Sequence, residues 1–220
     1  MPSASITSGG RRMADALLHI TRDEAAAVAR AAEILTEAFA EDPAMQYFTA
    51  PTAPENRPAL RRKVIELLIE RHLRAGHSLW GWRAEGALIG CALVEDAAPS
   101  WRQFATQLAG LPALARLPLR VLARLNAYAR RSQRQRPAGS GPFLAMIGLA
   151  ETARGKGAGR AFMMALHRHY PPGAHWVLDT ENCANLAFYE RLGYQLHATE
   201  TLGPVTLYKL HRLPEAGNHP

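Results

Sequence analysis

The sequence predicts an α/β domain in which a sheet is flanked by helices. Strand and helix patterns alternate along residues 16–210, a hairpin pattern occupies residues 78–95, and a strand, a glycine-rich turn and a helix follow one another over residues 143–169. A length of 220 residues with 48% hydrophobic and 20% charged content suits a single domain. We expect this domain to span residues 15–213, with a flexible N-terminal tail at residues 1–14 and a C-terminal tail at residues 214–220.

The N-terminal half opens with a short strand pattern at Ala16–Ile20. Thr21 and Glu24 then match a capping box, and apolar residues at three- and four-residue intervals predict a helix that continues to about Ala40. The pair Asp42-Pro43 is expected to end this helix.

A second amphipathic helix is predicted over residues 60–74, with Gly76 as its C-cap. The hairpin follows, with strands at residues 79–82 and 87–94 around a turn at Glu85-Gly86. These two strands are expected to be antiparallel neighbours in the sheet.

Residues 99–136 are predicted to form a helical insertion, broken at Pro112 and Pro118, whose leucine and aromatic residues cover one face of the fold. A linker at residues 137–142 leads to the remaining elements. These are a strand at residues 143–149, helices at 157–169 and 183–192, and strands at 175–179, 194–197 and 205–210.

The composition argues against several classes of protein. The net charge of +7 comes from arginine, much of it between Arg102 and Arg136, where leucines at helical spacing favour a solvated helix face over a nucleic-acid site. The two cysteines, Cys91 and Cys183, have neither disulfide-framework nor zinc-site spacing. No run approaches the roughly 18 apolar residues that span a bilayer, and no export signal follows Arg11-Arg12, so we expect a soluble cytoplasmic protein.

The segment Arg154-Gly155-Lys156-Gly157-Ala158-Gly159-Arg160 follows a predicted strand and opens a predicted helix. Glycines let the backbone approach a ligand, and the N–H groups at a helix N-terminus favour an anion such as a pyrophosphate. The spacing does not fit a P-loop. A dinucleotide-binding fold remains a weak alternative, because Arg160 replaces its third glycine, and a plain helix-entry loop is the other alternative.

This segment resembles motif A of the GNAT N-acetyltransferase superfamily, which reads Q/R-G-x-G-x-G/A. A second family signature, N-x-x-F-Y-x-x-x-G-F/Y, is matched by residues 185–194, from Asn185 to Tyr194. The resemblance covers nearly the whole chain. It implies a mixed, mostly antiparallel twisted sheet flanked by helices, with a helical insertion before the motif A strand, and acetyl-CoA as the cofactor.

Within the superfamily the chain resembles the puromycin-type branch, through residues 37–43 and Leu178-Asp179-Thr180, and through the helical insertion. One departure from the usual motif lies at the end of the motif A strand, where Leu149 replaces a valine and Glu151 replaces a proline. The loop entry is expected to differ slightly without loss of a phosphate contact.

The resemblance also implies roles for individual residues. Main-chain groups of Ile147 and Leu149 would bind the pantetheine arm and acetyl carbonyl, and Asn185 would hold the same arm, although it also suits a helix N-cap. Tyr189 would protonate the departing thiolate of coenzyme A as the general acid, the alternative being a packed helix tyrosine. The pyrophosphate would lie on residues 154–160.

The sequence does not identify the general base that takes a proton from the acceptor amine. The candidates are five carboxylates near predicted strand ends or in the first inter-helix loop: Glu41, Asp42, Glu95, Asp96 and Glu181. The scattered histidines indicate no metal site, and direct transfer is expected instead of a covalent intermediate on Cys183.

The expected function is therefore acetyl transfer from acetyl-CoA to an amine of a small molecule or a peptide, by a monomer or a homodimer. Two alternatives belong to other classes of protein: a non-catalytic acyl-CoA-binding sensor and a basic nucleic-acid-binding module. Turnover of acetyl-CoA would separate the first from an enzyme, and binding that weakens steeply with salt would favour the second.

Overall fold

A computed structural model describes residues 16–96, 117–137 and 139–213. The expected tails at residues 1–14 and 214–220, and residues 99–116 of the expected insertion, lie outside these ranges.

A seven-stranded sheet runs through the molecule, in the order β1-β2-β3-β4-β5-β7-β6. Neighbouring strands are antiparallel except for β4 and β5, which are parallel. The prediction of a mixed, mostly antiparallel sheet is therefore confirmed. The strands are β1 (Ala16–Ile20), β2 (Ser78–Ala84), β3 (Ala87–Glu95), β4 (Phe143–Leu149), β5 (Trp176–Thr180), β6 (Gln195–Leu202) and β7 (Val205–Arg212).

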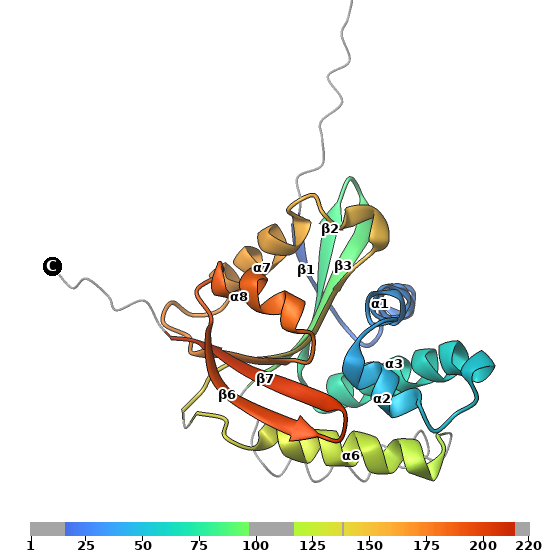
Figure 1. Ribbon diagram of the computed structural model, residues 1–220. Helices are drawn as coiled ribbons and strands as arrows, with labels where there is room; N and C mark the ends of the chain where they lie inside the picture. The colour runs from blue at the N-terminus through green and yellow to red at the C-terminus, as the bar shows by residue number, and fades with distance from the viewer. Residues whose placement is uncertain (1–15, 97–116, 138, 214–220) are drawn as a thin grey trace, which may run out of the picture.

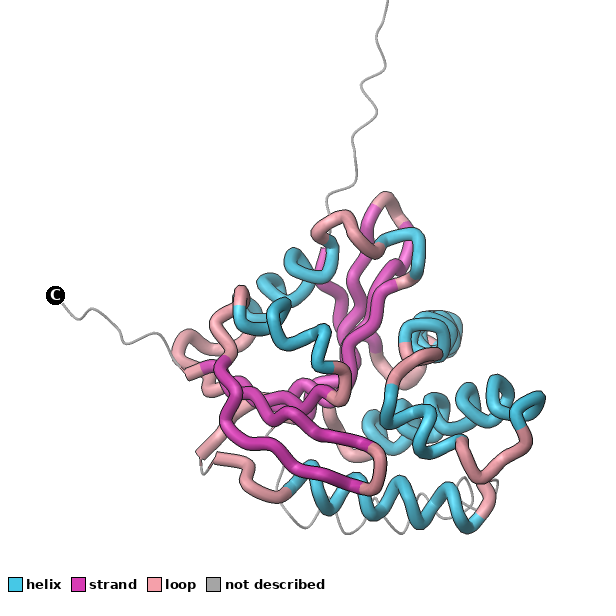
Figure 2. Tube along the Cα trace, in the orientation of Figure 1, coloured by secondary structure: helices cyan, strands magenta, loops and turns pink. Residues whose placement is uncertain are grey.

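Helices flank both faces of this sheet (Figures 1 and 2). On one side lie α1 (Ala25–Ala38), α2 (Pro43–Thr49), α3 (Arg57–Arg74) and α6 (Leu119–Gln133), and on the other α7 (Ala158–His169) and α8 (Leu186–Glu190). The described ranges also contain three short 3₁₀ turns: η1 (Pro54–Asn56), η2 (Glu151–Ala153) and η3 (Cys183–Asn185).

Alternating apolar residues in the central strands supply a core on each face of the sheet. In β3, Cys91 and Leu93 pack with α1, α2 and α3, whereas Ala92 and Val94 pack with α7 and α8. This alternation follows from the period of two in a strand, and a strand buried on both faces reads as a continuous apolar run. The run Ala87–Val94 in the sequence has this character.

The connection between α1 and α3 differs from the prediction because it contains a helix. Asp42-Pro43 does not simply end α1: Pro43 is the first residue of α2, and the Asp42 carboxylate accepts a hydrogen bond of 2.9 Å from the Met45 N–H. Proline suits a first helical position and aspartate suits an N-cap, so the pair starts a helix.

The capping box at the start of α1 is only half formed. Glu24 accepts a hydrogen bond from the Thr21 N–H at 2.7 Å, as predicted, but the Thr21 hydroxyl donates to the same carboxylate at 3.0 Å instead of capping the helix. The helix therefore begins at Ala25 without a side-chain cap.

Helix α6 is the described part of the expected insertion, and it begins directly after Pro118. It lies beside the β6–β7 hairpin (Figure 1). Lys209 of β7 donates hydrogen bonds to the carbonyl oxygens of Arg131 and Ser132, at 2.9 and 2.8 Å, and the Arg131 guanidinium pairs with Glu200 of β6 at 2.9 Å. These contacts fix the end of α6 against the sheet.

Strands β4 and β5 separate after their first residues. Only Phe143 and Leu144 of β4 pair with β5, opposite Val177 and Leu178. A bulge in β4 lies at the point of separation. Met146 pairs with Leu93 and Leu144 pairs with Val94, so Ala145 has no partner in β3. Bulges bend a strand and increase its twist, so β4 turns away from β5 and leaves an opening in the sheet.

Beyond the bulge, β4 passes very close to α1 at Gly148. A Cβ atom on Gly148 would lie 2.8 Å from the Ala38 Cβ and 3.0 Å from the Leu35 Cδ2. Real Cβ atoms do not approach this closely, so α1 can pack here only against a glycine.

Candidate functional site

A groove of about 650 Å³ lies beside the open end of β4. All of the predicted site residues line it except Lys156 and Ala158. The lining residues come from β4, the glycine-rich loop and the region of α8: Ile147, Gly148, Leu149, Arg154, Gly155, Gly157, Gly159, Arg160, Asn185, Phe188, Tyr189, Arg191 and Leu192, with Ala38 of α1.

The glycine-rich loop adopts a backbone that requires glycine at two positions. Gly155 and Gly157 have φ angles of 74° and 78°, in the left-handed region. A Cβ atom at either position would meet no atom within 4 Å, so the space above the loop is open. Gly157 is the N-cap of α7, and the N–H groups of the first turn of this helix have no partner within the helix. Open space beside free N–H groups and Arg160 forms a site for an anion.

The remaining loop residues contribute in other ways. The Lys156 ammonium donates to the Thr152 carbonyl oxygen at 2.9 Å, and Ala158 is the first residue of α7. The Arg154 Nε donates to the Leu149 carbonyl oxygen at 3.1 Å, which ties the loop to the end of β4. A ligand that used this carbonyl would require the Arg154 side chain to turn.

Tyr189 lies on α8, with 7% of its surface exposed. Its ring packs between those of Phe188 and Tyr194, at centroid distances of 5.2 and 5.8 Å. Burial, and then the carboxylates of Glu181 and Asp42, raise the pKa of the Tyr189 hydroxyl, so the phenol keeps its proton at neutral pH.

Asn185 precedes α8, but its side chain does not cap the helix, so the predicted N-cap role is wrong. Its Nδ2 atom donates instead to the Thr180 Oγ1 at 3.3 Å, which directs the amide toward the end of β5. The cap of this segment is Asn182, whose side chain accepts a hydrogen bond of 3.0 Å from the Ala184 N–H.

A second cavity, of about 350 Å³, lies on the other side of the opening in the sheet. Its lining residues come mainly from the helices α2, α3 and α6 and the strands β3, β4 and β5. Ile147, Asn185 and Tyr189 line both this cavity and the groove. The two spaces therefore share one wall, and Tyr189 is part of that wall.

Three of the five candidate bases, Asp42, Glu95 and Glu181, line this cavity. Glu41 instead accepts a hydrogen bond from Gln46 on the surface, and Asp96 is held by Ser78 and Tyr170. The structure thus reduces the candidates from five to three.

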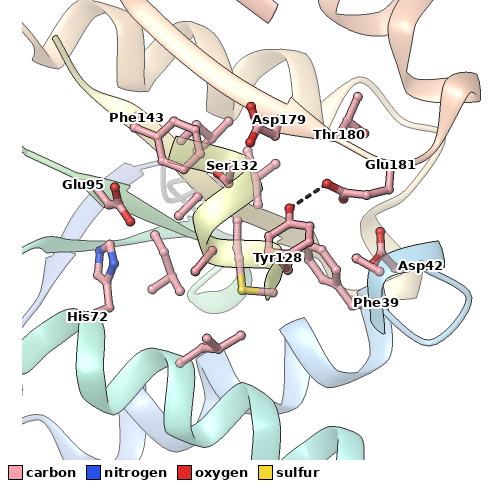
Figure 3. A pocket seen from close by; sticks show the side chains of 18 of the residues that line it. Phe39, Asp42, His72, Glu95, Tyr128, Ser132, Phe143, Asp179, Thr180 and Glu181 are labelled. Carbon is pink, nitrogen blue, oxygen red and sulfur yellow. Dashed lines mark hydrogen bonds between the residues drawn. The ribbon is translucent and has the colours of Figure 1, made fainter. Parts of the chain in front are cut away.

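Glu181 has the most strongly perturbed carboxyl group of these candidates. Burial, the nearby Asp42 carboxylate and, more weakly, Asp179 raise the pKa of Glu181 to about 8. The Tyr128 hydroxyl of α6 donates to its Oε1 at 2.6 Å and opposes this shift (Figure 3). Burial also raises the pKa of Asp42, despite hydrogen bonds from backbone N–H groups. A carboxylate with a pKa near 8 can accept and release a proton near neutral pH.

Asp179 is held in an ion pair beside the same cavity. The Lys209 ammonium lies 3.7 Å from its Oδ2 and donates its hydrogen bonds elsewhere, to the carbonyl oxygens of α6. Burial raises the pKa of Asp179, while Ser132 and Lys209 lower it. Its charge is therefore already partly balanced within the fold.

Two kinds of site are not found among the described residues. In residues 16–96, 117–137 and 139–213, no three His, Cys, Asp or Glu side chains are grouped so as to hold a metal ion. The helices of the same ranges are too short or too polar to span a bilayer.

Sequence reasoning missed two contributors to the second cavity. Helix α2 was not predicted, although the N-capping aspartate followed by a proline at the first helical position could have indicated it. Tyr128 was assigned to the apolar face of the insertion, and nothing in the sequence indicates that it reaches Glu181, which is 53 residues away along the chain.

Several solved structures resemble this fold. A structure described as histone acetyltransferase HPA2 and related acetyltransferase, from Corynebacterium glutamicum, has a TM-score of 0.67 at 20% identity, over 94% of this chain and 99% of that one. An N-acetyltransferase from Staphylococcus aureus has a TM-score of 0.55 at 15% identity, over 82% and 92% of the two chains. The ribosomal-protein-S18-alanine N-acetyltransferase of Escherichia coli has a TM-score of 0.50 at 12% identity, over 94% and 99%.

At these identities the similarity shows a common fold. No curated protein sequence matches the chain significantly. A family profile, described as acetyltransferase (GNAT) family, matches residues 28–194. This range includes the glycine-rich loop, Asn185 and Tyr189. The chain therefore belongs to the GNAT acetyltransferase family.

Proposed function

We propose that this protein transfers the acetyl group of acetyl-CoA directly to an amine of a small molecule or a peptide. The observation that carries the proposal is the wall shared by the groove and the second cavity. A donor in the groove and an acceptor in the cavity would meet at Tyr189, which is the arrangement that direct transfer between two bound substrates requires.

Coenzyme A would lie in the groove with its pyrophosphate on residues 154–160. The left-handed glycines, the N-terminus of α7 and the guanidinium groups of Arg154 and Arg160 support this placement. The backbone of β4 beyond Leu144 has no strand partner on the β5 side, so its polar groups could bind the pantetheine arm and acetyl carbonyl, with the Leu149 carbonyl oxygen first released by the Arg154 side chain.

Proton transfers would be divided between the two sides of the shared wall. Glu181 would accept a proton from the acceptor amine, whose nitrogen forms the new bond to the acetyl carbon. Tyr189 would give its proton to the thiolate as the carbon–sulfur bond breaks. The raised pKa of Glu181 supports the first role, and the protonated phenol of Tyr189 supports the second.

Within the family, we propose a relationship to the puromycin-type branch, on the strength of residues 37–43 and 178–180 and of the helical segment before β4. Puromycin therefore belongs in any panel of test amines. A non-catalytic acyl-CoA sensor would have the same groove, and thiol release in the presence of an amine separates it from an enzyme.

The first test is binding of coenzyme A and acetyl-CoA to the full chain, measured by calorimetry. We expect the wild-type protein to bind both and Gly157→Leu to bind neither, because leucine is strained at a φ of 78° and its side chain would fill the groove. Gly139→Leu is a matched control: Gly139 also has a left-handed φ, of 70°, and open space around it, but it does not line the groove.

If the wild-type protein binds neither compound at millimolar concentration, the proposed function is lost. If Gly157→Leu and Gly139→Leu bind equally well, the glycine-rich loop is not the cofactor site.

A further inference from the structure

The second cavity has two ends of different charge. Near the shared wall lie the carboxylates of Glu181 and Asp42, both of which are close enough to affect the pKa of Tyr189. This is the end at which a reacting nitrogen would have to lie. An ammonium group is favoured here, because it stabilises the ionised forms of these two carboxyl groups, whose pKa values are raised by burial.

The opposite end carries guanidinium and imidazole groups. His72 and Glu95 lie on the side of the cavity away from Asp42 and Glu181 (Figure 3). Glu95 is already paired with Arg136, whose Nη1 lies 3.1 Å from its Oε2 and whose guanidinium stacks on the Phe143 ring at 3.6 Å.

Arg71 is the charge at this end that the fold leaves unbalanced. It precedes His72 on α3 and lines the cavity, and it makes no ion pair with any side chain in the described part of the chain. His72 adds no charge at neutral pH, because burial lowers its pKa to about 4. With Glu95 paired to Arg136 and Asp179 paired to Lys209, the charge of Arg71 is the one left without a partner among these groups.

Apolar side chains fill the wall between the two ends. They come from α1, α2, α3, α6, β3 and β4: Phe39, Met45, Phe48, Leu68, Leu93, Leu125 and Met146. Such a wall suits a hydrocarbon or aromatic body. The cavity is lined by one further carboxylate, Asp179, and this group is paired with Lys209.

We infer that the acceptor is a small amine with one positive charge and an apolar body, whose far end is neutral or anionic and never a second ammonium group. This inference rests on the proposed function and specifies its substrate class. The carboxylates draw the reacting ammonium to Tyr189, and Arg71 repels a second cation or attracts an anion at the far end. The volume of about 350 Å³ is in the range of small-molecule sites.

Three amines of equal length test this inference, because they differ only at the far end. These are hexylamine, 6-aminohexanoate and 1,6-diaminohexane, with a methyl, a carboxylate and an ammonium group there. With the full chain and saturating acetyl-CoA, we expect kcat/KM for the diamine to be at least about tenfold below that of the other two, because like charges placed together are strongly unfavourable.

The variant Arg71→Glu tests the cause. Reversal of this charge should raise kcat/KM for 1,6-diaminohexane and lower it for 6-aminohexanoate, each by about tenfold, and hexylamine should change least of the three. Lys63→Glu is the matched control, since Lys63 lies on the same helix, is exposed and does not line the cavity. The control should leave the order of the three amines unchanged, and coenzyme A binding to both variants verifies that they are folded.

Each other outcome counts against the inference. A diamine that is the best of the three substrates, or an order that Arg71→Glu does not change, would overturn it. So would turnover of a lysine-containing or N-terminal peptide when none of the three amines reacts, although the proposed function would then survive. Failure of the wild-type protein to bind coenzyme A at all would mark the failure of the proposed function instead.

Discussion

Tyr189 is buried by its neighbours and still borders two cavities. The packing of its ring between Phe188 and Tyr194 fixes the position of the hydroxyl, which makes no hydrogen bond within the described residues. A hydroxyl that is held in place by ring packing alone can be removed without loss of the packing.

We therefore predict that Tyr189→Phe lowers kcat by about 10²–10⁴-fold and leaves the affinity for acetyl-CoA nearly unchanged, because a proton needed only in the transition state does not affect ground-state binding. Single-turnover rates with saturating acetyl-CoA measure the effect even if product release limits kcat. Tyr194→Phe is the control, because it removes the hydroxyl of a neighbouring ring that borders neither cavity. Equal single-turnover rates for Tyr189→Phe and the wild-type protein would leave Tyr189 as a packing residue.

At the scale of elements, α6 contributes Tyr128 to the wall of the second cavity. Its Tyr128 donates to Glu181 at 2.6 Å, and its last turn is fixed by Lys209. Val121 of this helix is fully buried, so deletion of the whole insertion would damage the core as well as the cavity. Single substitutions on α6 are the better test of its contribution.

Tyr128→Phe should raise the pKa of Glu181, because the hydrogen bond from Tyr128 is one of the interactions that lower it. In the wild-type protein, kcat/KM should rise with pH through an apparent pKa near 8, as Glu181 loses its proton. In Tyr128→Phe the same rise should occur at higher pH, with a lower rate at pH 7. Glu181→Gln should lack this rise. If all three proteins have the same dependence of kcat/KM on pH, the rise comes from deprotonation of the amine substrate and not from Glu181.

The strands were predicted more accurately than the helices that surround the second cavity. Alternating and continuous apolar runs identified β1, β3, β4 and β7, and the glycine-rich loop and the α8 region are short motifs that contain their own site residues. The cavity, in contrast, combines α2, α3, α6 and the ends of three strands. Contacts such as Tyr128–Glu181 depend on how these elements pack, and a single sequence contains no local pattern for them.

At the scale of the whole molecule, several buried groups make stability depend on pH in opposite directions. The pKa values of His72 and His167 are lowered to about 4 by burial, so their contribution to stability is present above pH 6.5 and is lost as the pH falls through 4. The pKa of Glu181 is raised, so its contribution is present below pH 4.5 and is lost as the pH rises through 8.

A comparison with Glu181→Gln isolates the second effect. We predict that this variant and the wild-type protein have similar melting temperatures near pH 4.5, and that the variant becomes progressively more stable, relative to the wild-type protein, up to about pH 8. The amide never ionises, so the cost of a buried charge is removed. Thermal unfolding measured at pH intervals tests this, and a difference that does not change with pH would show that Glu181 ionises freely in the folded protein.

The bulge at Ala145 also determines which side of the sheet each later residue of β4 faces. Ala145 and Met146 both lie with the α1 core, and Ile147 and Leu149 return to the α7 core. Ala145 and Met146 together therefore take the place of a single residue in the alternation of the strand. A slip of one residue would turn Leu149 toward α1, where even a Cβ atom would lie 2.8 Å from Ala38. The strand contains one glycine, Gly148. Because only this glycine fits against α1, the strand can adopt only the register in which Ile147 and Leu149 face the groove.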